Sequence, residues 1–175
     1  VKPATDIIKD ELKNWPKVLY QFSGGKDSQM ALEVVTKIAK QYGIQELAAF
    51  LDTGAEFPTF LPHIESVCAK NAIDLIVLKS DAAGTMINDG AFPHPIYKDC
   101  IHRFINDPIN KLARVEGAVI VSGHRPSQKN GKSKTDLTSK VSSRKLTMIS
   151  PLFAFSDSEI SSYQANMECW SGYAK

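Results

Sequence analysis

Short apolar runs that favour β-strands alternate along this chain with segments whose apolar residues recur at helical spacing. The five runs are residues 17–22, 47–51, 73–78, 118–121 and 146–149. The clearest helical segment follows the first run, where apolar side chains recur three and four positions apart from Met30 to Tyr42. Strands that alternate with helices indicate βαβ units and parallel pairing. We therefore predict an α/β fold: a single doubly wound, mostly parallel five-stranded sheet with helices on both faces.

The length of the chain, 175 residues, suits one domain of ordinary size. We expect residues 1–16 to form a helical lead-in and residues 17–165 to form the main domain. Ser156 and Glu159 stand at capping-box spacing, which predicts the start of a last helix. We interpret residues 166–175 as the start of a C-terminal tail that is incomplete here.

Bulk composition limits the classes of partner. A net charge of +2 is too small to indicate a nucleic-acid partner by itself. No apolar run approaches the roughly 20 residues that span a bilayer, and the start, VKPATDIIKDELK, lacks the apolar segment of a secretory signal. We therefore expect no membrane partner. Cys68, Cys100 and Cys169 form no paired motif, which favours a cytoplasmic protein with reduced thiols.

Residues 125–145, RPSQKNGKSKTDLTSKVSSRK, form a basic segment with few apolar residues. Its seven basic side chains, against the single acid Asp136, are Arg125, Lys129, Lys132, Lys134, Lys140, Arg144 and Lys145. A loop of this length inside a compact domain is usually functional or disordered. Three interpretations are open for this segment. It could act as a mobile lid over a phosphate site, it could contact a nucleic-acid backbone, or it could be a solvated loop without a role.

The stretch from Ser23 to Ser28, SGGKDS, lies where the first strand passes into the first long helix. Two glycines allow a tight turn and close approach of the backbone to a ligand. Free N–H groups at a helix start favour an anion, to which Lys26 adds positive charge and the two serines add hydroxyls. A P-loop of the GxxxxGK[ST] type is excluded, because the position of its first glycine holds no glycine. The stretch predicts a phosphate cradle of another kind.

SGGKDS resembles the SGGxDS signature of the PP-loop ATP pyrophosphatases, also called adenine nucleotide α-hydrolases. Further segments are similar to the phosphoadenosine phosphosulfate (PAPS) reductase-like group of that superfamily. They are LDTGAEFP at 51–58, Cys100-Ile-His-Arg103 with Pro108, Gly123-His-Arg125, and SPL at 150–152 with FSDSE at 155–159 and Tyr163. The resemblance covers roughly residues 17 to 165 in the family's order, so that this region is expected to be a PP-loop nucleotide-binding domain.

The resemblance implies adenine nucleotide chemistry at an α-phosphate, with ATP or a PAPS-like nucleotide bound and Mg²⁺ as a companion ion. The matched residues that would hold the phosphates are Ser23, Gly24, Gly25, Lys26, Asp27 and Ser28. Asp52 and Thr53 would lie beside the adenosine, while Gly123 and Arg125 would close the other side. Lys26 and Arg125 are the candidate catalytic residues, because both can stabilise charge on phosphoryl or sulfuryl oxygens. Asp27 is expected to brace the loop by hydrogen bonds or to bind Mg²⁺, with bracing favoured.

Two departures from the family pattern concern the substrate. Ile105 stands where a lysine is usual, and Pro126-Ser127-Gln128 replaces an acid–serine pair. The C-terminal cysteine motif of the PAPS reductases is also not evident. The leading hypothesis is therefore an enzyme acting on ATP or an adenylyl sulfate. The alternatives are ATP-dependent sulfur insertion (thiolation) into nucleic acid, contacted through residues 125–145, and a non-catalytic nucleotide-binding regulatory module. Oligomeric state is left open.

Overall fold

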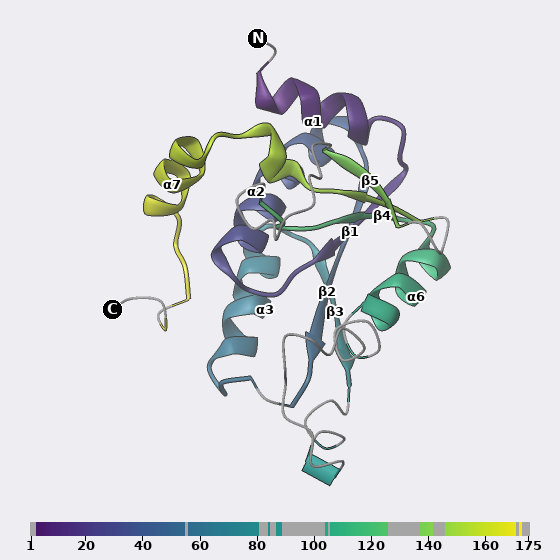
Figure 1. Cartoon of the computed structure of the whole chain (residues 1–175), viewed down its shortest axis with the longest axis vertical. Coiled ribbons are helices and arrows are strands. Elements are labelled where there is room, and N and C mark those ends of the chain that lie inside the picture. The colour runs from purple at the N-terminus through teal and green to yellow at the C-terminus, as the bar shows by residue number, and fades with distance from the viewer. Residues whose placement is uncertain are drawn as a thin grey trace.

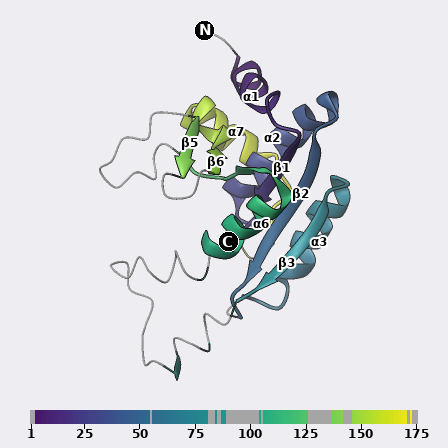
Figure 2. The same cartoon turned by 90° about the vertical axis from the view of Figure 1, so that its right-hand side faces the viewer.

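Figures 1 and 2 show the fold of the chain in a computed structural model. The residues that the structure describes are 3–54, 56–80, 84, 87–88, 104, 106–125, 137–141, 146–170 and 172. Statements below about what is present or absent concern these residues.

A single sheet forms the centre of the fold. Its strands are β1 (Lys17–Gln21), β2 (Gln45–Asp52), β3 (Asp74–Lys79), β4 (Val119–Val121), β5 (Thr138–Val141) and β6 (Leu146–Ile149), in the spatial order β3-β2-β1-β4-β6-β5. β1, β2, β3, β4 and β6 pair in parallel. β5 pairs antiparallel with β6 at one edge, with Thr138 opposite Ile149.

The five predicted strands are confirmed, and so is their parallel arrangement. The sixth strand, β5, was not predicted, because its sequence TSKV lies inside the lysine-rich segment and lacks a continuous apolar run. An antiparallel strand at the edge of a parallel sheet needs only one partner, so it tolerates this polar composition. Part of the basic segment is therefore ordered against β6.

Helices cover both faces of the sheet, as predicted. They are α1 (Ala4–Leu12), α2 (Lys26–Tyr42), α3 (Phe60–Lys70), α6 (Asp107–Glu116), the short 3₁₀ helix η3 (Pro151–Ala154) and α7 (Asp157–Ala165). Residues of α1, α2, α3, η3 and α7 share the larger core with one face of the sheet, while α6 packs on the other face in a smaller core (Figures 1 and 2). No helix in the described part of the chain is long and apolar enough to cross a membrane.

α2 is the longest helix and the one that carries the phosphate-loop residues at its start. Its apolar residues are buried along most of its length, including Met30, Leu32 and Val35, each 0 % exposed. The helix ends at Gly43, whose φ of 63° is left-handed and whose N–H bonds back to the helix. Burial of one whole side fixes the direction of α2, and with it the place to which its N-terminus points.

The predicted capping box at the start of α7 is present. The Glu159 backbone N–H donates to the Ser156 hydroxyl at 3.3 Å, and the Ser156 N–H donates to the Glu159 carboxylate at 2.7 Å. The Ser156 hydroxyl also donates to the Glu159 carboxylate at 2.6 Å. This bond, together with the one from the Ser156 N–H, lowers the pKa of Glu159 from its ordinary value, since both favour the charged carboxylate. Ile160 is fully buried and attaches the helix to the core.

Replacement of Ser156 by alanine removes the acceptor that caps α7. We expect Ser156→Ala to lower the free energy of unfolding by about 1 kcal/mol, measured by urea denaturation. Ser161→Ala, on an exposed position of the same helix, is the matched control and should be close to neutral. Equal stability of the two variants would show that the capping box does not support the helix.

Candidate active site at the strand ends

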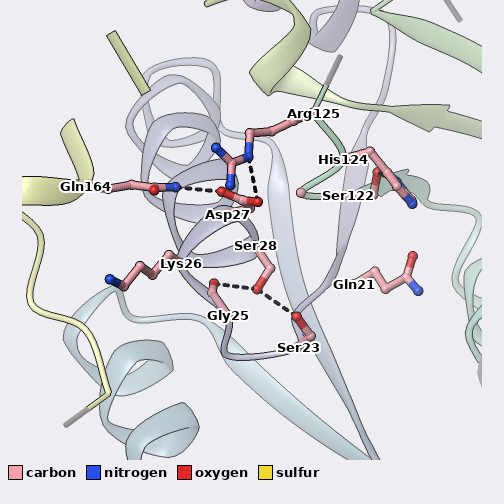
Figure 3. Close-up of a pocket in the computed structure, with 11 residues that line it drawn as sticks. Gln21, Ser23, Gly25, Lys26, Asp27, Ser28, Ser122, His124, Arg125 and Gln164 are labelled. Atoms are coloured by element: carbon pink, nitrogen blue, oxygen red, sulfur yellow. Dashed lines mark hydrogen bonds and ion pairs between the residues drawn. The ribbon is translucent and has the colours of Figure 1, made fainter. Parts of the chain in front are cut away.

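The sheet order places the candidate site at a topological switch point. From β1, the chain continues to β2 and β3 on one side, while β4 and β6 lie on the other side. Ligands of open parallel sheets bind at such a point, beyond the carboxyl ends of the strands. An open cavity of about 470 Å³ lies there (Figure 3). Its lining residues are Gln21, Ser23, Gly25, Lys26, Asp27, Ser28, Ser122, Gly123, His124, Arg125 and Gln164.

The turn between β1 and α2 depends on Gly24. Its φ of +72° lies in the left-handed region, and a Cβ there would lie 2.8 Å from the Phe60 ring atom Cζ. Either fact disfavours any other residue. The next residue, Gly25, caps α2 without a side chain and has an ordinary extended conformation, with φ of −71° and ψ of 155°. The first turn of α2 therefore faces the cavity without a side-chain cap from that position.

Two serine hydroxyls hold the loop closed from within. The Ser28 hydroxyl donates to the Gly25 carbonyl at 2.9 Å, and its oxygen lies 3.0 Å from the Ser23 hydroxyl oxygen. Since Ser28 has a single proton, Ser23 is the donor between the two. The first-turn N–H groups of a helix have no acceptor within the helix, and the dipole adds positive potential there. Together with Lys26, this geometry makes one wall of the cavity electrostatically favourable to an anion.

Asp27 connects three parts of the chain. Its Oδ2 atom accepts a bond from Arg125 Nε at 2.8 Å, and its Oδ1 atom accepts one from Gln164 Nε2 at 2.6 Å (Figure 3). The Asp27 and Arg125 side chains are 18% and 29% exposed. Asp27 was expected to brace the loop through backbone N–H groups. In the structure two side chains, one from the loop after β4 and one from α7, donate to its carboxylate.

Gly123 brings the loop after β4 directly against the start of α2. A Cβ at this position would lie 2.5 Å from the Ser28 backbone nitrogen and 2.7 Å from the Asp27 carbonyl carbon. Both atoms belong to helical backbone, which cannot give way cheaply. This approach places Arg125, two residues later, within reach of Asp27.

Beside Gly123, a hydrogen-bonded chain leads into the core. The Ser122 hydroxyl oxygen lies 2.7 Å from His124 Nδ1 and 3.1 Å from the Ser150 hydroxyl. Ser122 is 2% exposed and Ser150 is 7% exposed, whereas His124 is exposed at the cavity wall. The buried serines thus hold the imidazole from one side.

A second, more apolar cavity of about 180 Å³ adjoins the first. Gln21 and Ser23 line both. The remaining residues around it are Phe22, Ala49, Phe50, Leu51, Thr53, Glu56, Phe60 and Ile109. The two cavities together run from the start of α2 to the end of β2.

The structure separates Asp52 from Thr53. Thr53 lines the apolar cavity, and its N–H and hydroxyl donate to the Glu56 carboxylate at 3.0 and 2.7 Å. Asp52 lines neither cavity, and its carboxylate accepts a bond from the Gly54 N–H at 3.0 Å. In this geometry Asp52 shapes the turn after β2, while Thr53 faces the space beside it.

The described side chains do not form a ready metal centre. They contain no group of three or more His, Cys, Asp or Glu placed to hold an ion. Each oxygen of the Asp27 carboxylate accepts one protein hydrogen bond, so an Mg²⁺ ion bound there would have to use the remaining lone pairs beside Arg125 and Gln164. Binding of Mg²⁺ by Asp27 therefore stays a prediction.

Cys68 and Cys169, the two cysteines that the structure describes, are not among the residues that line the two cavities. Cys68 is 2% exposed in α3, and burial raises the pKa of its thiol to about 11. Burial also raises the pKa of Cys169, while the positive charge of Lys26 acts against that change. Cys100 and Arg103, with the motif they belong to, fall outside the described residues.

Three residues that line the first cavity lie outside the sequence motifs: Gln164, Gln21 and Ser122. Gln164 is 137 positions from Asp27 along the chain, and no local pattern distinguishes it from other glutamines of exposed helices. Gln21 and Ser122 stand at the ends of β1 and β4, where parallel strands present side chains to ligands. The positions of the strand ends could therefore have identified Gln21 and Ser122 as candidate site residues.

A methyl group at position 123 would push apart the two backbones that form the cavity wall. We expect Gly123→Ala to lower the free energy of unfolding by roughly 1–3 kcal/mol and to weaken binding of pyrophosphate, measured by denaturation and calorimetry. Gly43→Ala is the control, because its cost arises from a φ of +63° and its Cβ would meet nothing within 4 Å. That variant should keep pyrophosphate affinity. If both variants bound pyrophosphate as the parent does, the close approach would not shape the cavity.

Solved structures of other proteins share this fold. One is the NH₃-dependent NAD synthetase from Campylobacter jejuni subsp. jejuni NCTC 11168 in complex with the nitrate ion. The superposition covers 97% of this chain and 72% of the synthetase, with a TM-score of 0.67 and 12% sequence identity. Another is the U34-tRNA thiolase NcsA from Methanococcus maripaludis with its [4Fe-4S] cluster. That superposition covers 95% of this chain and 65% of the thiolase, with a TM-score of 0.67 and 16% sequence identity. At these identities the likeness shows the fold.

Sequence comparison gives the family. The chain is 31% identical over 67 residues to the uncharacterized protein YbdN of Escherichia coli (strain K12), a match that spans 38% of the chain and 16% of YbdN. The model of the phosphoadenosine phosphosulfate reductase domain matches residues 17–169, which is most of the chain. The predicted resemblance to PP-loop proteins is thereby confirmed, and the chain belongs to the phosphoadenosine phosphosulfate reductase domain family.

Proposed function

We propose that this chain is an enzyme that binds ATP or an adenylyl sulfate and acts at its α-phosphate or sulfuryl group. The observation that carries the proposal is the pair of adjoining cavities, one polar and built on a helix N-terminus, the other apolar. An adenine nucleotide has the same division into a polyanionic chain and an aromatic base. Relatives in the family support an enzyme, while the subclass is part of the proposal.

The polar cavity suits the phosphates. Its wall combines the N-terminus of α2 with the side chains of Lys26 and Arg125, all favourable to negative charge. Its volume of about 470 Å³ leaves room for a chain of phosphoryl or sulfuryl groups. The glycines of the loop let the backbone come close to such a chain.

The apolar cavity suits the base. Phe22, Leu51 and Phe60 supply apolar and aromatic surface, while Thr53 and Glu56 supply polar atoms at its border. Pockets of this mixture, mostly apolar with a few fixed polar groups, are typical of small-ligand sites. The shared wall of Gln21 and Ser23 is where the sugar between base and phosphates would lie.

The chemistry follows from where negative charge develops. In adenylyl transfer, a nucleophilic atom of the acceptor bonds to the α-phosphorus, the bond to the leaving oxygen breaks, and pyrophosphate departs. Charge then grows on the phosphoryl oxygens, where Lys26, Arg125 and the N–H groups of α2 can stabilise it. The same donors would face the sulfuryl oxygens of an adenylyl sulfate. Mg²⁺, if it accompanies the nucleotide, would be held mainly by phosphate oxygens, and no step here depends on it.

Two alternatives belong to the same proposal. Thiolation of a nucleic acid is favoured by the basic segment 125–145, which would follow a phosphate backbone. A non-catalytic regulatory module would keep the cavities without turnover. A cytoplasmic setting is also proposed, since Cys68 and Cys169 carry free thiols.

The decisive experiment measures release of pyrophosphate and AMP from ATP with Mg²⁺, and of sulfite from adenylyl sulfate or PAPS with a thiol reductant. Pyrophosphate release that requires added transfer RNA or DNA, together with sulfur incorporation, would favour thiolation. Binding of ATP without turnover of any substrate would favour the regulatory module. Absence of binding of all three nucleotides would contradict the nucleotide proposal.

Loss of the Lys26 ammonium group removes a charge from the phosphate wall. We expect Lys26→Ala to weaken binding of ATP or adenylyl sulfate roughly tenfold or more, because hydrogen bonds to charged groups contribute about 1.5–3 kcal/mol. Calorimetry measures the affinity. Lys111→Ala, on an exposed position of α6, has the same change in net charge and should bind as the parent does. A loss of affinity shared by both variants would point to bulk charge rather than to the cavity.

Filling the apolar cavity tests whether it holds the base. Ala49 is 1% exposed and lines that cavity. We expect Ala49→Leu to weaken ATP binding by about tenfold, or 1.4 kcal/mol, while pyrophosphate binding stays unchanged. Ala69→Leu, exposed on α3, is the matched control. Equal losses for ATP and pyrophosphate would mean that the variant disturbs the phosphate wall and that the base lies elsewhere.

A further inference from the structure

Gln164 is a residue of the site to which no role follows from the sequence motifs. It lies in the last turn of α7, and its side-chain amide nitrogen is 2.6 Å from Asp27 Oδ1 at the cavity wall (Figure 3). The opposite oxygen of the same carboxylate, Oδ2, accepts the bond from Arg125 Nε. One carboxylate thus holds two side chains, one on each oxygen.

Contacts outside the cavity fix the position of α7. Its N-terminus is closed by the capping box, and Ile160 is fully buried. Tyr163, next to Gln164, donates from its hydroxyl to the Glu33 carboxylate at 3.1 Å, and Lys37 donates to the same hydroxyl at 3.3 Å. The burial of Tyr163 and the adjacent Glu33 raise the pKa of its hydroxyl to about 12. Gln164 therefore approaches Asp27 from a helix that is anchored independently.

Two donors on opposite oxygens determine the plane of a carboxylate. With Arg125 alone, the Asp27 carboxylate could rotate about its last side-chain bond and carry the guanidinium with it. With Gln164 on the other oxygen, such a rotation breaks a short hydrogen bond to a charged acceptor, one of the stronger kinds in proteins. The bond from Nε also ties the planar guanidinium to that carboxylate, and so to the start of α2.

We propose that Gln164 is a positioning residue, which acts through Asp27 to hold the Arg125 guanidinium in the orientation that serves the phosphate cavity. This inference rests on the proposed function for its catalytic consequence. The structural part of the inference, that Gln164 controls the orientation of Arg125, does not depend on the proposed function. The two can therefore be tested separately.

Gln164→Leu removes the donor and keeps a side chain of similar size. Gln164 is only partly buried, so the fold should tolerate the change. We expect kcat with the nucleotide substrate to fall roughly tenfold, as when a preorganised donor to developing charge is misplaced, while KM changes less than threefold. Gln41→Leu, the same substitution at an exposed position of α2, is the matched control and should leave both unchanged.

Gln164→Glu adds a readout that a purely structural role would not move. A charged carboxylate opposite Asp27 repels it, whereas a protonated one can donate as glutamine does. The activity of this variant relative to the parent should therefore rise as the pH falls from 8 to 5.5. Lys26, His124 and Arg125 line the same cavity, and Glu33 and Lys37 contact Tyr163 from α2. These groups are present in both proteins, so the ratio isolates position 164.

The Arg125 Nε–H resonance gives a direct reading that needs no turnover. In the parent and in Gln41→Leu it should exchange slowly with water, and in Gln164→Leu it should exchange at least about tenfold faster as the paired geometry loosens. Arg125→Lys assigns the signal. Unchanged exchange in Gln164→Leu would overturn the positioning role, whatever the activity. A parent protein that binds no nucleotide but shows the faster exchange in Gln164→Leu would refute the proposed function and retain the positioning role.

Discussion

The contact between the backbone at Gly123 and the first turn of α2 is the constraint on which the site depends. β1 and β4 are neighbours in the sheet, so the segments that follow them leave the same edge side by side. With no side chain at position 123, the loop after β4 lies directly on the Asp27–Ser28 backbone. Arg125 can then reach Asp27 across 98 positions of sequence. The ion pair between Asp27 and Arg125, which forms part of the cavity wall, depends on this approach.

Most of the fold could be predicted from the sequence because its central parallel strands, β1 and β4 and the middle of β2, are buried on both faces. Such strands read as apolar runs, and the helix α2 between the first two shows helical periodicity from Met30 to its end at Tyr42. The edge strand β5 could not be predicted in the same way. An edge strand pairs through its backbone, and the polar sequence TSKV gives no apolar pattern by which to recognise it.

The residues of the candidate site also divide into those that the sequence predicted and those that it did not. The residues of SGGKDS and of Gly123-His-Arg125 follow strand ends, so their local pattern was enough to place them near a ligand site. Most of them line the first cavity in the structure. The partners of Asp27 could not be predicted, because they are set by tertiary packing. Gln164 belongs to a helix of which the sequence indicates only the start, at Ser156. Asp52 shows the reverse case. It stands in a matched motif, yet its carboxylate is used by the turn that it begins.

The wall that the two cavities share has a consequence for how strongly each half of a ligand must bind. Gln21 and Ser23 belong to both cavities, so a molecule anchored in the polar one already has its other end at the entrance of the apolar one. The second contact is then made within one molecule, at a high effective concentration. Weak contacts in a space of about 180 Å³ can therefore contribute strongly to discrimination between ligands that share the same anionic group.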